Sequence, residues 1–280
     1  MDLQLNRACV WCGPVFVVLF LIGFWVVGGF VPPPSPAWEA DRMAEFFIDN
    51  AMPIRVGMLI CASAAILIVP WAAAVSVQLK RIEGRFAVLG PCQLIGAGMS
   101  TLVFEYILFF WVAATFRAER SAPIIQAVVD LGWIPFVGLA GTAILQAVAI
   151  GVAILADKRA VPILPRWAGY ANLWCALMFT PGTVNVFFKD GPLAWNGLIS
   201  WYMVLVAFCI WFLINTYVVI KALNLQETQT KPPPPAETPD ELDRLKADIA
   251  VMQTELERLV HSQDEQHAVL SNVQRRRSAR

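Results

Sequence analysis

The stretch Leu89–Phe116, LGPCQLIGAGMSTLVFEYILFFWVAATF, decides the fold class of this chain. It is longer than the roughly 20 mainly apolar residues that a helix needs to cross a bilayer. Its only charged side chain is Glu105, near the middle. A segment of this length and composition predicts a membrane-spanning α-helix.

Five further apolar runs have the same character. The whole chain is 58% hydrophobic and 15% charged, whereas soluble domains carry about a quarter charged residues. The alternating pattern of about 10 residues that marks membrane strands is absent. We therefore expect an all-α, polytopic bundle of six transmembrane helices within residues 1–225. The predicted spans are 11–31, 54–79, 88–116, 131–156, 166–188 and 195–222.

The charged residues predict how the bundle is oriented. Cationic residues gather in the loops after the second and fourth predicted spans and favour the cytoplasmic side. They are Lys80, Arg81, Arg85, Lys158, Arg159 and Arg166. This bias predicts a multi-pass protein of the cytoplasmic membrane with both termini in the cytoplasm. The first span shows no cleavage site and is expected to stay as an anchor.

A short amphipathic helix is predicted at about residues 36–50, in the first loop. Ser35 suits an N-cap and Pro36 the first helical position, and apolar residues then alternate with acidic ones. Such a helix lies either on the outer membrane surface or against its own bundle.

Glu105 is the sharpest candidate for function. Gly98 and Thr101 precede it by seven and four residues, so the three share a helix face, and we expect the carboxylate to point into the bundle. An isolated carboxylate in hydrocarbon costs several kcal/mol. Glu105 is then either a proton- or cation-responsive group in a polar cavity or a structural partner of Arg55 or of a buried amide.

The fifth predicted span is irregular. Arg166 to Thr180 would cover only about 22 Å as a helix, and Pro181-Gly182 then interrupts it. Broken helices mark binding sites in many transporters, although a plain proline kink explains the same residues. Gln146, on a face of small residues in the fourth span, is expected to bond between helices. The candidate binding residues are Glu105, Gln146, Asn172, Pro181 and Asn185.

The C-terminal part differs from the bundle. A proline-rich linker is expected at 226–238, a coiled coil at 239–274 and a basic tail at 275–280. Apolar residues spaced by three and four predict the coiled-coil core, which consists of Leu242, Leu245, Ile249, Met252, Leu256 and Leu259. The stripe fits a homo-oligomer, or a single amphipathic helix on the membrane or on another protein. The basic tail predicts no specific nucleic-acid binding.

Several classes of chemistry are not indicated by the sequence. Both histidines, His261 and His267, lie in the C-terminal part, so no intramembrane histidine cluster can bind a metal. There is no phosphate-binding loop and no nucleophile paired with a base. We expect no catalytic residues, no metal and no cofactor, and hence a protein that is not an enzyme.

Residues 5–223 also carry a family likeness. The stretches are Asn6–Pro14, Gly29–Pro34, Ile54–Gly57, Val77–Gly84, Asp130–Trp133, Phe187–Lys189, Gly191–Pro192 and Ala194–Gly197. In these the chain resembles a family of six-span integral membrane proteins of actinobacteria and other bacteria, to which no activity is assigned. The resemblance implies a bacterial inner membrane and leaves the coiled coil outside.

Two functions fit these observations. The first is a carrier or binding protein for a small amphipathic solute or lipid. The alternative is a non-catalytic membrane scaffold that oligomerises or recruits partners through the coiled coil.

Overall fold

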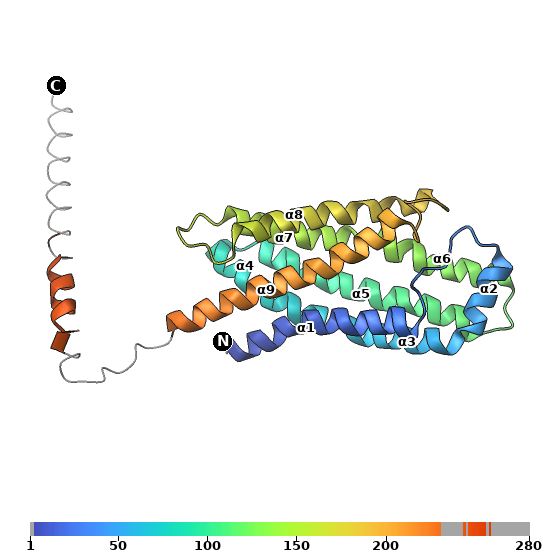
Figure 1. Cartoon of the computed structure of the whole chain (residues 1–280), viewed down its shortest axis with the longest axis horizontal. Coiled ribbons are helices and arrows are strands. Elements are labelled where there is room, and N and C mark those ends of the chain that lie inside the picture. Colours follow the sequence, from blue (N-terminus) through green and yellow to red (C-terminus); the bar gives the residue numbers. More distant parts are fainter. Residues whose placement is uncertain (1–2, 231–242, 245, 256–257, 259–280) are drawn as a thin grey trace, which may run out of the picture. The chain divides into compact units, whose positions relative to one another are not determined.

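The computed structural model describes residues 3–230, 243–244, 246–255 and 258. The chain divides into a bundle, Met1–Thr228, and a second unit, Gln229–Arg280. The described residues form helices, turns and loops without a strand, so the all-α prediction is confirmed for them (Figure 1). The α-helices are α1 Leu3–Leu21, α2 Ala40–Asp49, α3 Ala51–Ala65, α4 Ile68–Glu83, α5 Leu89–Phe116, α6 Ala122–Gly138, α7 Gly141–Ala156, α8 Arg166–Phe179 and α9 Val204–Thr230.

Four helical segments depart from α geometry. Two are π-helices, in which the turns are wider, and two are 3₁₀-helices, in which they are tighter. The π-helices are η1 (Ile22–Val27) and η4 (Leu198–Met203), and the 3₁₀-helices are η2 (Gly84–Phe86) and η3 (Thr180–Phe187). Each of the four directly follows or precedes an α-helix of the bundle.

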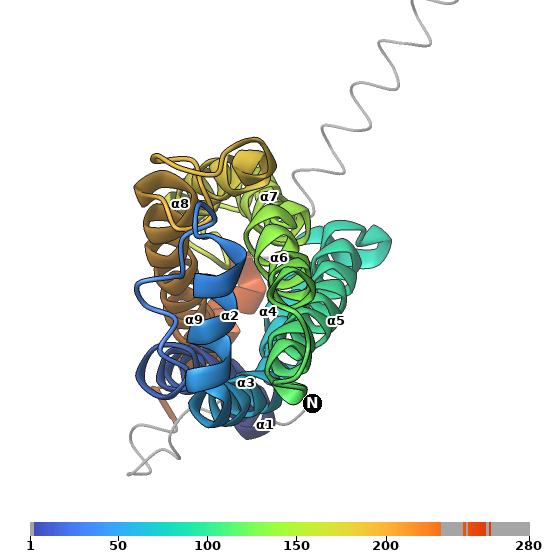
Figure 2. The same cartoon turned by 90° about the vertical axis from the view of Figure 1, so that its right-hand side faces the viewer.

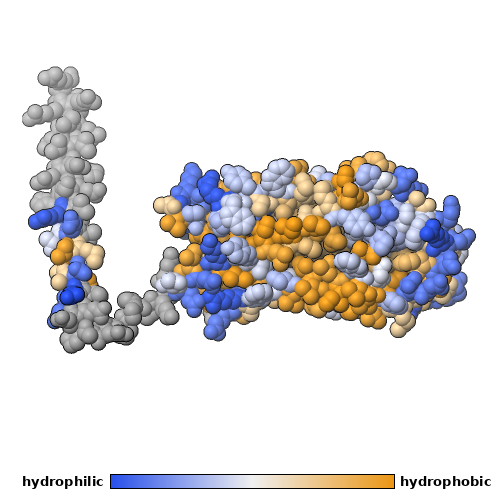
Figure 3. Space-filling model, in the orientation of Figure 1, coloured by the Kyte–Doolittle hydropathy of each residue, from blue (hydrophilic) through white to orange (hydrophobic). Residues whose placement is uncertain are grey.

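Five helical stretches in the described part of the chain, two of them built from two successive α-helices, are long and apolar enough to cross a membrane. They are Leu3–Val27, Ala51–Phe86, Leu89–Phe116, Ala122–Ala156 and Leu198–Thr228. The remaining predicted span, 166–188, is not among them and consists of the 14-residue α8 followed by η3. Figure 3 shows that apolar side chains cover the middle of the visible face of the bundle, between two more hydrophilic ends. This pattern indicates a multi-pass membrane protein.

The first and last helices of the bundle meet at one end. The guanidinium of Arg7 donates to the carboxylate of Glu227 and to the amide oxygen of Asn224, each at 2.6 Å. The start of α1 and the end of α9 therefore lie together (Figure 1). We call this the terminal end of the bundle and the opposite one the distal end.

Side chains close the helix ends at the loops of the terminal end. The Glu83 carboxylate accepts the backbone N–H groups of Val88, Leu89 and Gly90 at 2.8–2.9 Å. These belong to the first turn of α5, whose N–H groups have no acceptor inside the helix. Arg159, from the loop after α7, donates to the carbonyl of Arg81 at 2.6 Å. The α4–α5 and α7–α8 loops are thereby joined.

Helix α2 lies across the distal end of the bundle (Figure 2). Met43 and Phe47 are fully buried, and the ring centroids of Phe47 and Phe30 are 5.7 Å apart. Of the two interpretations of the predicted 36–50 helix, the structure supports packing against its own bundle. The helix begins at Ala40, four residues later than predicted.

Aromatic rings fill the middle of the bundle along its length. Trp71 and Phe212, about halfway along the bundle, are 4.3 Å apart between ring centroids, and Trp111 and Trp133, closer to the distal end, are 4.7 Å apart. Phe24, in the π-helix η1, contacts rings from five other segments. This continuous aromatic core holds the helices around it.

The second unit is described only in part. Residues 246–255 are helical, with Ile249 47% and Met252 64% exposed. The other four predicted core residues, Leu242, Leu245, Leu256 and Leu259, lie outside the described residues. In the bundle, α9 runs on to Thr230 and so includes the beginning of the predicted 226–238 linker.

Candidate functional site

Three helix irregularities meet around one cavity inside the bundle. Helix α6 ends at Gly138 and α7 begins at Gly141, and Leu139 between them has φ −82° and ψ 45°, outside the α region. Helix α8 gives way to η3 at Thr180, and the π-helix η4 precedes α9. Segments next to each irregularity line the cavity. Irregular backbone at membrane depth is tolerated where it is packed in protein or lines a cavity.

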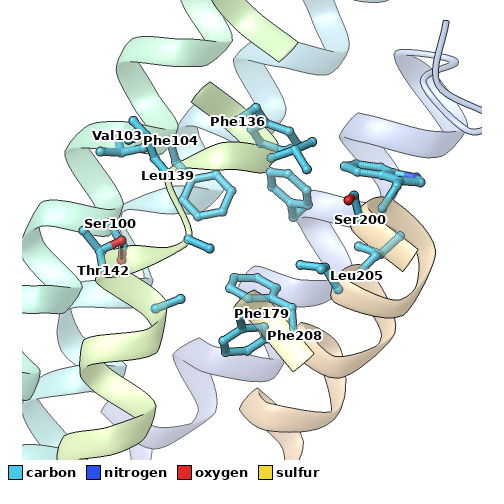
Figure 4. A pocket seen from close by; sticks show the side chains of 16 residues that line it. Ser100, Val103, Phe104, Phe136, Leu139, Thr142, Phe179, Ser200, Leu205 and Phe208 are labelled. Carbon is cyan, nitrogen blue, oxygen red and sulfur yellow. Dashed lines mark hydrogen bonds between the residues drawn. The ribbon is translucent and has the colours of Figure 1, made fainter. Parts of the chain in front are cut away.

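The cavity has a volume of about 100 Å³, and its walls are mostly aromatic and aliphatic (Figure 4). For comparison, a cavity of about 150 Å³ engineered in an apolar core binds benzene. This space is about two-thirds as large, so it suits a short piece of hydrocarbon chain, and a small ring enters it when the side chains of the wall shift outward. The aromatic lining residues are Phe20, Phe104, Phe136, Phe179, Trp201 and Phe208.

Three hydroxyl side chains supply most of the polarity of the lining: Ser100, Thr142 and Ser200. Ser200 Oγ lies 3.0 Å from the carbonyl oxygen of Pro181 and 2.9 Å from that of Leu193. Because its hydrogen is shared between these two carbonyls, Ser200 ties the π-helix η4 to the irregular segment η3.

Ser100 and Thr142 form a chain of hydrogen bonds with Gln146. The amide Nε2 of Gln146 donates to Ser100 Oγ at 2.9 Å, and Ser100 Oγ donates to Thr142 Oγ1 at 2.9 Å. Gln146 Nε2 also lies 3.2 Å from the carbonyl oxygen of Thr142. The predicted interhelical role of Gln146 is confirmed, since these hydrogen bonds join α7 to α5. The last two residues of the series, Ser100 and Thr142, line the cavity.

Two more of the predicted binding residues lie near the break in α8. Pro181 is the second residue of η3, and its carbonyl oxygen accepts the hydrogen of Ser200, which lines the cavity. Asn185 is 2% exposed and donates from Nδ2 to the carbonyl of Ile134 at 3.3 Å. Its Oδ1 has no partner among the described residues. The fifth predicted span is therefore broken rather than only kinked, because α-helical geometry stops at Thr180.

Asn172 belongs to a different polar cluster, buried between α8 and α9. Its side chain and that of Asn215 donate to each other at 3.1 Å in both directions. Trp211 Nε1 donates to Asn172 Oδ1 at 2.7 Å. Asn172 is 0% exposed and does not line the cavity, so its amide is fully engaged in joining the two helices.

Glu105 follows the cavity residue Phe104 but does not itself line the cavity. Its side chain is partly exposed, and no hydrogen bond or ion pair connects it with any residue that the structure describes. The partners considered for it are bonded elsewhere; Arg55, for example, donates to Thr115 Oγ1 at 3.0 Å. A Cβ at Gly98 would meet open space, so the face that Glu105 shares with Gly98 is not packed against another helix.

Sequence reasoning missed the aromatic walls and the break at Leu139-Ala140. Gly138 and Gly141 flank this break, and Pro135 precedes it by one turn. Those residues could have predicted the break. The aromatic residues could not have predicted the cavity walls, because phenylalanine is common in any membrane span and only packing brings these rings together.

No cluster of three histidine, cysteine, aspartate or glutamate side chains suited to a metal is present in the described ranges. No protein-family model, curated protein or solved structure matches the chain. The cavity geometry therefore carries the functional argument.

Proposed function

We propose that this chain is a six-span membrane protein that binds a small, mainly apolar molecule inside the bilayer. The sixth crossing is α8 with η3, which runs from the terminal to the distal end beside α7 (Figure 1). The contact of Arg7 with Glu227 supports this count, because two chain ends on the same side require an even number of crossings.

The terminal end is proposed to face the cytoplasm. The six cationic residues that favour this side lie in the loops after α4 and α7 or in the helix turns next to these loops, at the terminal end. At the distal end, α2 and its N-cap residue expose four acidic residues, Glu39, Asp41, Glu45 and Asp49, and one cationic residue, Arg42. This charge difference supports termini in the cytoplasm.

The cavity is the observation that carries the binding function. Apolar ligand sites are concave and lined by aromatic and aliphatic side chains with a few polar groups, as this cavity is. It also lies where three helices are interrupted, and broken helices near the bilayer centre form the sites of many transporters. A binding protein or a carrier for a small amphipathic solute or lipid fits this arrangement.

Photo-crosslinking tests the proposal. The purified protein in detergent is irradiated with a fatty acid that carries a diazirine on its chain, and the labelled peptides are mapped. We expect label on peptides containing Phe104, Phe136 or Phe208. Ala143→Phe fills the cavity and should remove this label, whereas Leu145→Phe adds the same ring on the exposed side of α7 and should leave it. Label confined to exposed residues in the wild type would refute the proposal.

The scaffold function remains the second candidate. Ile249 and Met252, two residues of the predicted coiled-coil core, are exposed on a helix in the described part of the second unit, as a face awaiting a partner would be. Cross-linking of the full chain in membranes is compared with a chain that ends before Pro239. Oligomers that persist after this deletion would show that the C-terminal helix does not drive self-association.

A further inference from the structure

The cavity wall includes backbone N–H groups without acceptors, at the start of α7. The first three N–H groups of an α-helix have no acceptor within the helix. In α7 these belong to Gly141, Thr142 and Ala143, and the N–H of Ile144 is the one that bonds to the carbonyl of Ala140, at 2.9 Å. Ala140 occupies the N-cap, and no side chain caps this helix. Of these residues Ala140, Thr142 and Ala143 line the cavity.

The hydroxyl pair adds a second donor. Ser100 and Thr142 have two hydroxyl hydrogens, and one of them makes the 2.9 Å bond between the two oxygens. Gln146 donates to Ser100 and so consumes no hydroxyl hydrogen. Threonine in a helix often donates to the carbonyl four residues earlier, but the break at Leu139-Ala140 interrupts that geometry. One hydroxyl hydrogen is left to point at a ligand.

Trp201 is the third, independent donor. It lines the same cavity from the π-helix η4 and is 5% exposed. Its indole Nε1–H has no acceptor among the described residues. A buried N–H without an acceptor costs about 1–3 kcal/mol, so a ligand oxygen that accepts from it would recover that loss.

The absence of cationic side chains from the lining indicates whether the ligand oxygen is charged or neutral. No lysine, arginine or histidine is among the lining residues. A carboxylate ligand would lose its water without gaining a cation, whereas a neutral oxygen has a much smaller desolvation cost. The unbonded N–H groups at the start of α7 can still donate to the partial negative charge of a carbonyl oxygen.

We propose that the cavity selects a neutral, apolar molecule that carries a carbonyl oxygen, such as an aryl ketone or a quinone ring. The ring packs among the phenylalanines, and the oxygen accepts from the start of α7, the free hydroxyl hydrogen or Trp201. This inference rests on the proposed binding function and names the chemical class of its ligand.

Three fluorinated probes of similar size test the assignment. Para-fluoroacetophenone carries the carbonyl, 1-ethyl-4-fluorobenzene replaces it with a methylene group, and para-fluorobenzoate carries a negative charge. ¹⁹F NMR titration of the full chain in detergent micelles gives each affinity, corrected for partition into protein-free micelles. We expect the ketone to bind about tenfold more tightly than the hydrocarbon, as for one hydrogen bond of ordinary strength, and the benzoate to bind most weakly.

Variants then locate the donors. Thr142→Val keeps the volume but removes the hydroxyl, and Trp201→Phe removes the indole N–H. At least one of them should lower the ketone preference threefold or more while hydrocarbon affinity stays within twofold. Thr101→Val is the matched control, because the Thr101 hydroxyl is bonded to the carbonyl of Ala97 in its own helix.

The outcomes separate the two proposals. Equal affinity of the wild type for ketone and hydrocarbon, or tightest binding of the benzoate, would overturn the carbonyl assignment and leave an apolar site in place. Unchanged ketone preference in both variants would overturn it as well. Failure of all three probes to bind, or binding that Ala143→Phe does not weaken, would refute the binding function itself.

Discussion

Replacement of Asn172 by leucine tests whether its side-chain amide stabilises the bundle or binds the ligand. The side chain of Asn172 makes three hydrogen bonds to α9: one in each direction with Asn215, and one accepted from Trp211. Leucine has the same branched shape with bulkier methyl groups, and it removes all three, together with the bond from Asn172 Nδ2 to the carbonyl of Ala168 within α8. The change lies outside the cavity, so any effect should appear in the stability of the bundle and not in its binding.

The expected cost follows from the bonds that are lost. Hydrogen bonds between membrane helices contribute about 0.6 kcal/mol each on average, so Asn172→Leu should lower the free energy of unfolding by about 2 kcal/mol. Asn215→Leu removes the two shared bonds and should cost about 1 kcal/mol. The double variant loses the same three bonds as Asn172→Leu alone. It should therefore also cost about 2 kcal/mol, which corresponds to a coupling energy of about 1 kcal/mol.

Unfolding of the purified protein in mixed micelles, by titration with sodium dodecyl sulfate, measures these energies. Near-ultraviolet circular dichroism follows the loss of tertiary packing, and the photo-crosslinking assay follows the cavity. If the cost in the double variant equals the sum of the costs in the two single variants, the hydrogen bonds between Asn172 and Asn215 are refuted. Loss of cavity labelling in Asn172→Leu, with the fold intact, would show that Asn172 acts in binding.

Three further changes test the packing of the bundle by the same unfolding titration. Glu83→Ala should cost about 1 kcal/mol, as the loss of a helix cap does, and a cost below the error of the titration would contradict the capping contact. Gly57→Ala places a methyl group against the backbone of Gly23 and should cost about 1–3 kcal/mol, whereas Gly98→Ala, which meets open space, should cost little. Arg7→Ala removes a partly exposed ion pair and should cost less than about 1 kcal/mol; a larger loss would show that this contact organises the bundle.

The sequence predicts helix positions well where hydropathy alone defines them. The span expected at 88–116 is the helix Leu89–Phe116. The first helix begins at Leu3, eight residues before the predicted span, because its polar first turns extend beyond the apolar region and stay helical. The fourth span likewise begins at Ala122, before the predicted residue 131. Hydropathy marks the part inside the bilayer, and helical geometry continues past it.

The site was less accessible to sequence reasoning. Pro181-Gly182 indicated the break after α8 because proline lacks the N–H that a helix requires. A π-helix needs only one extra residue in a turn, and the composition of Leu198–Met203 does not predict it. The direction of Glu105 depended on Gly98 and Thr101 facing the same neighbours, yet Thr101 is 4% exposed and Gly98 faces open space. Helix rotation is set by packing, which a single sequence does not contain.

The meeting of three helix irregularities at the cavity has a further consequence, for hydrogen exchange. Backbone amides inside a membrane are normally protected by bonds within their own helix, but Gly141, Thr142 and the turns of η3 lie where that ladder is interrupted. The bundle thus has a transverse layer of weak protection between two well-bonded halves. Local opening of the fold is expected to begin in this layer, so that the least stable amides of the bundle lie deep in its interior instead of at its frayed ends.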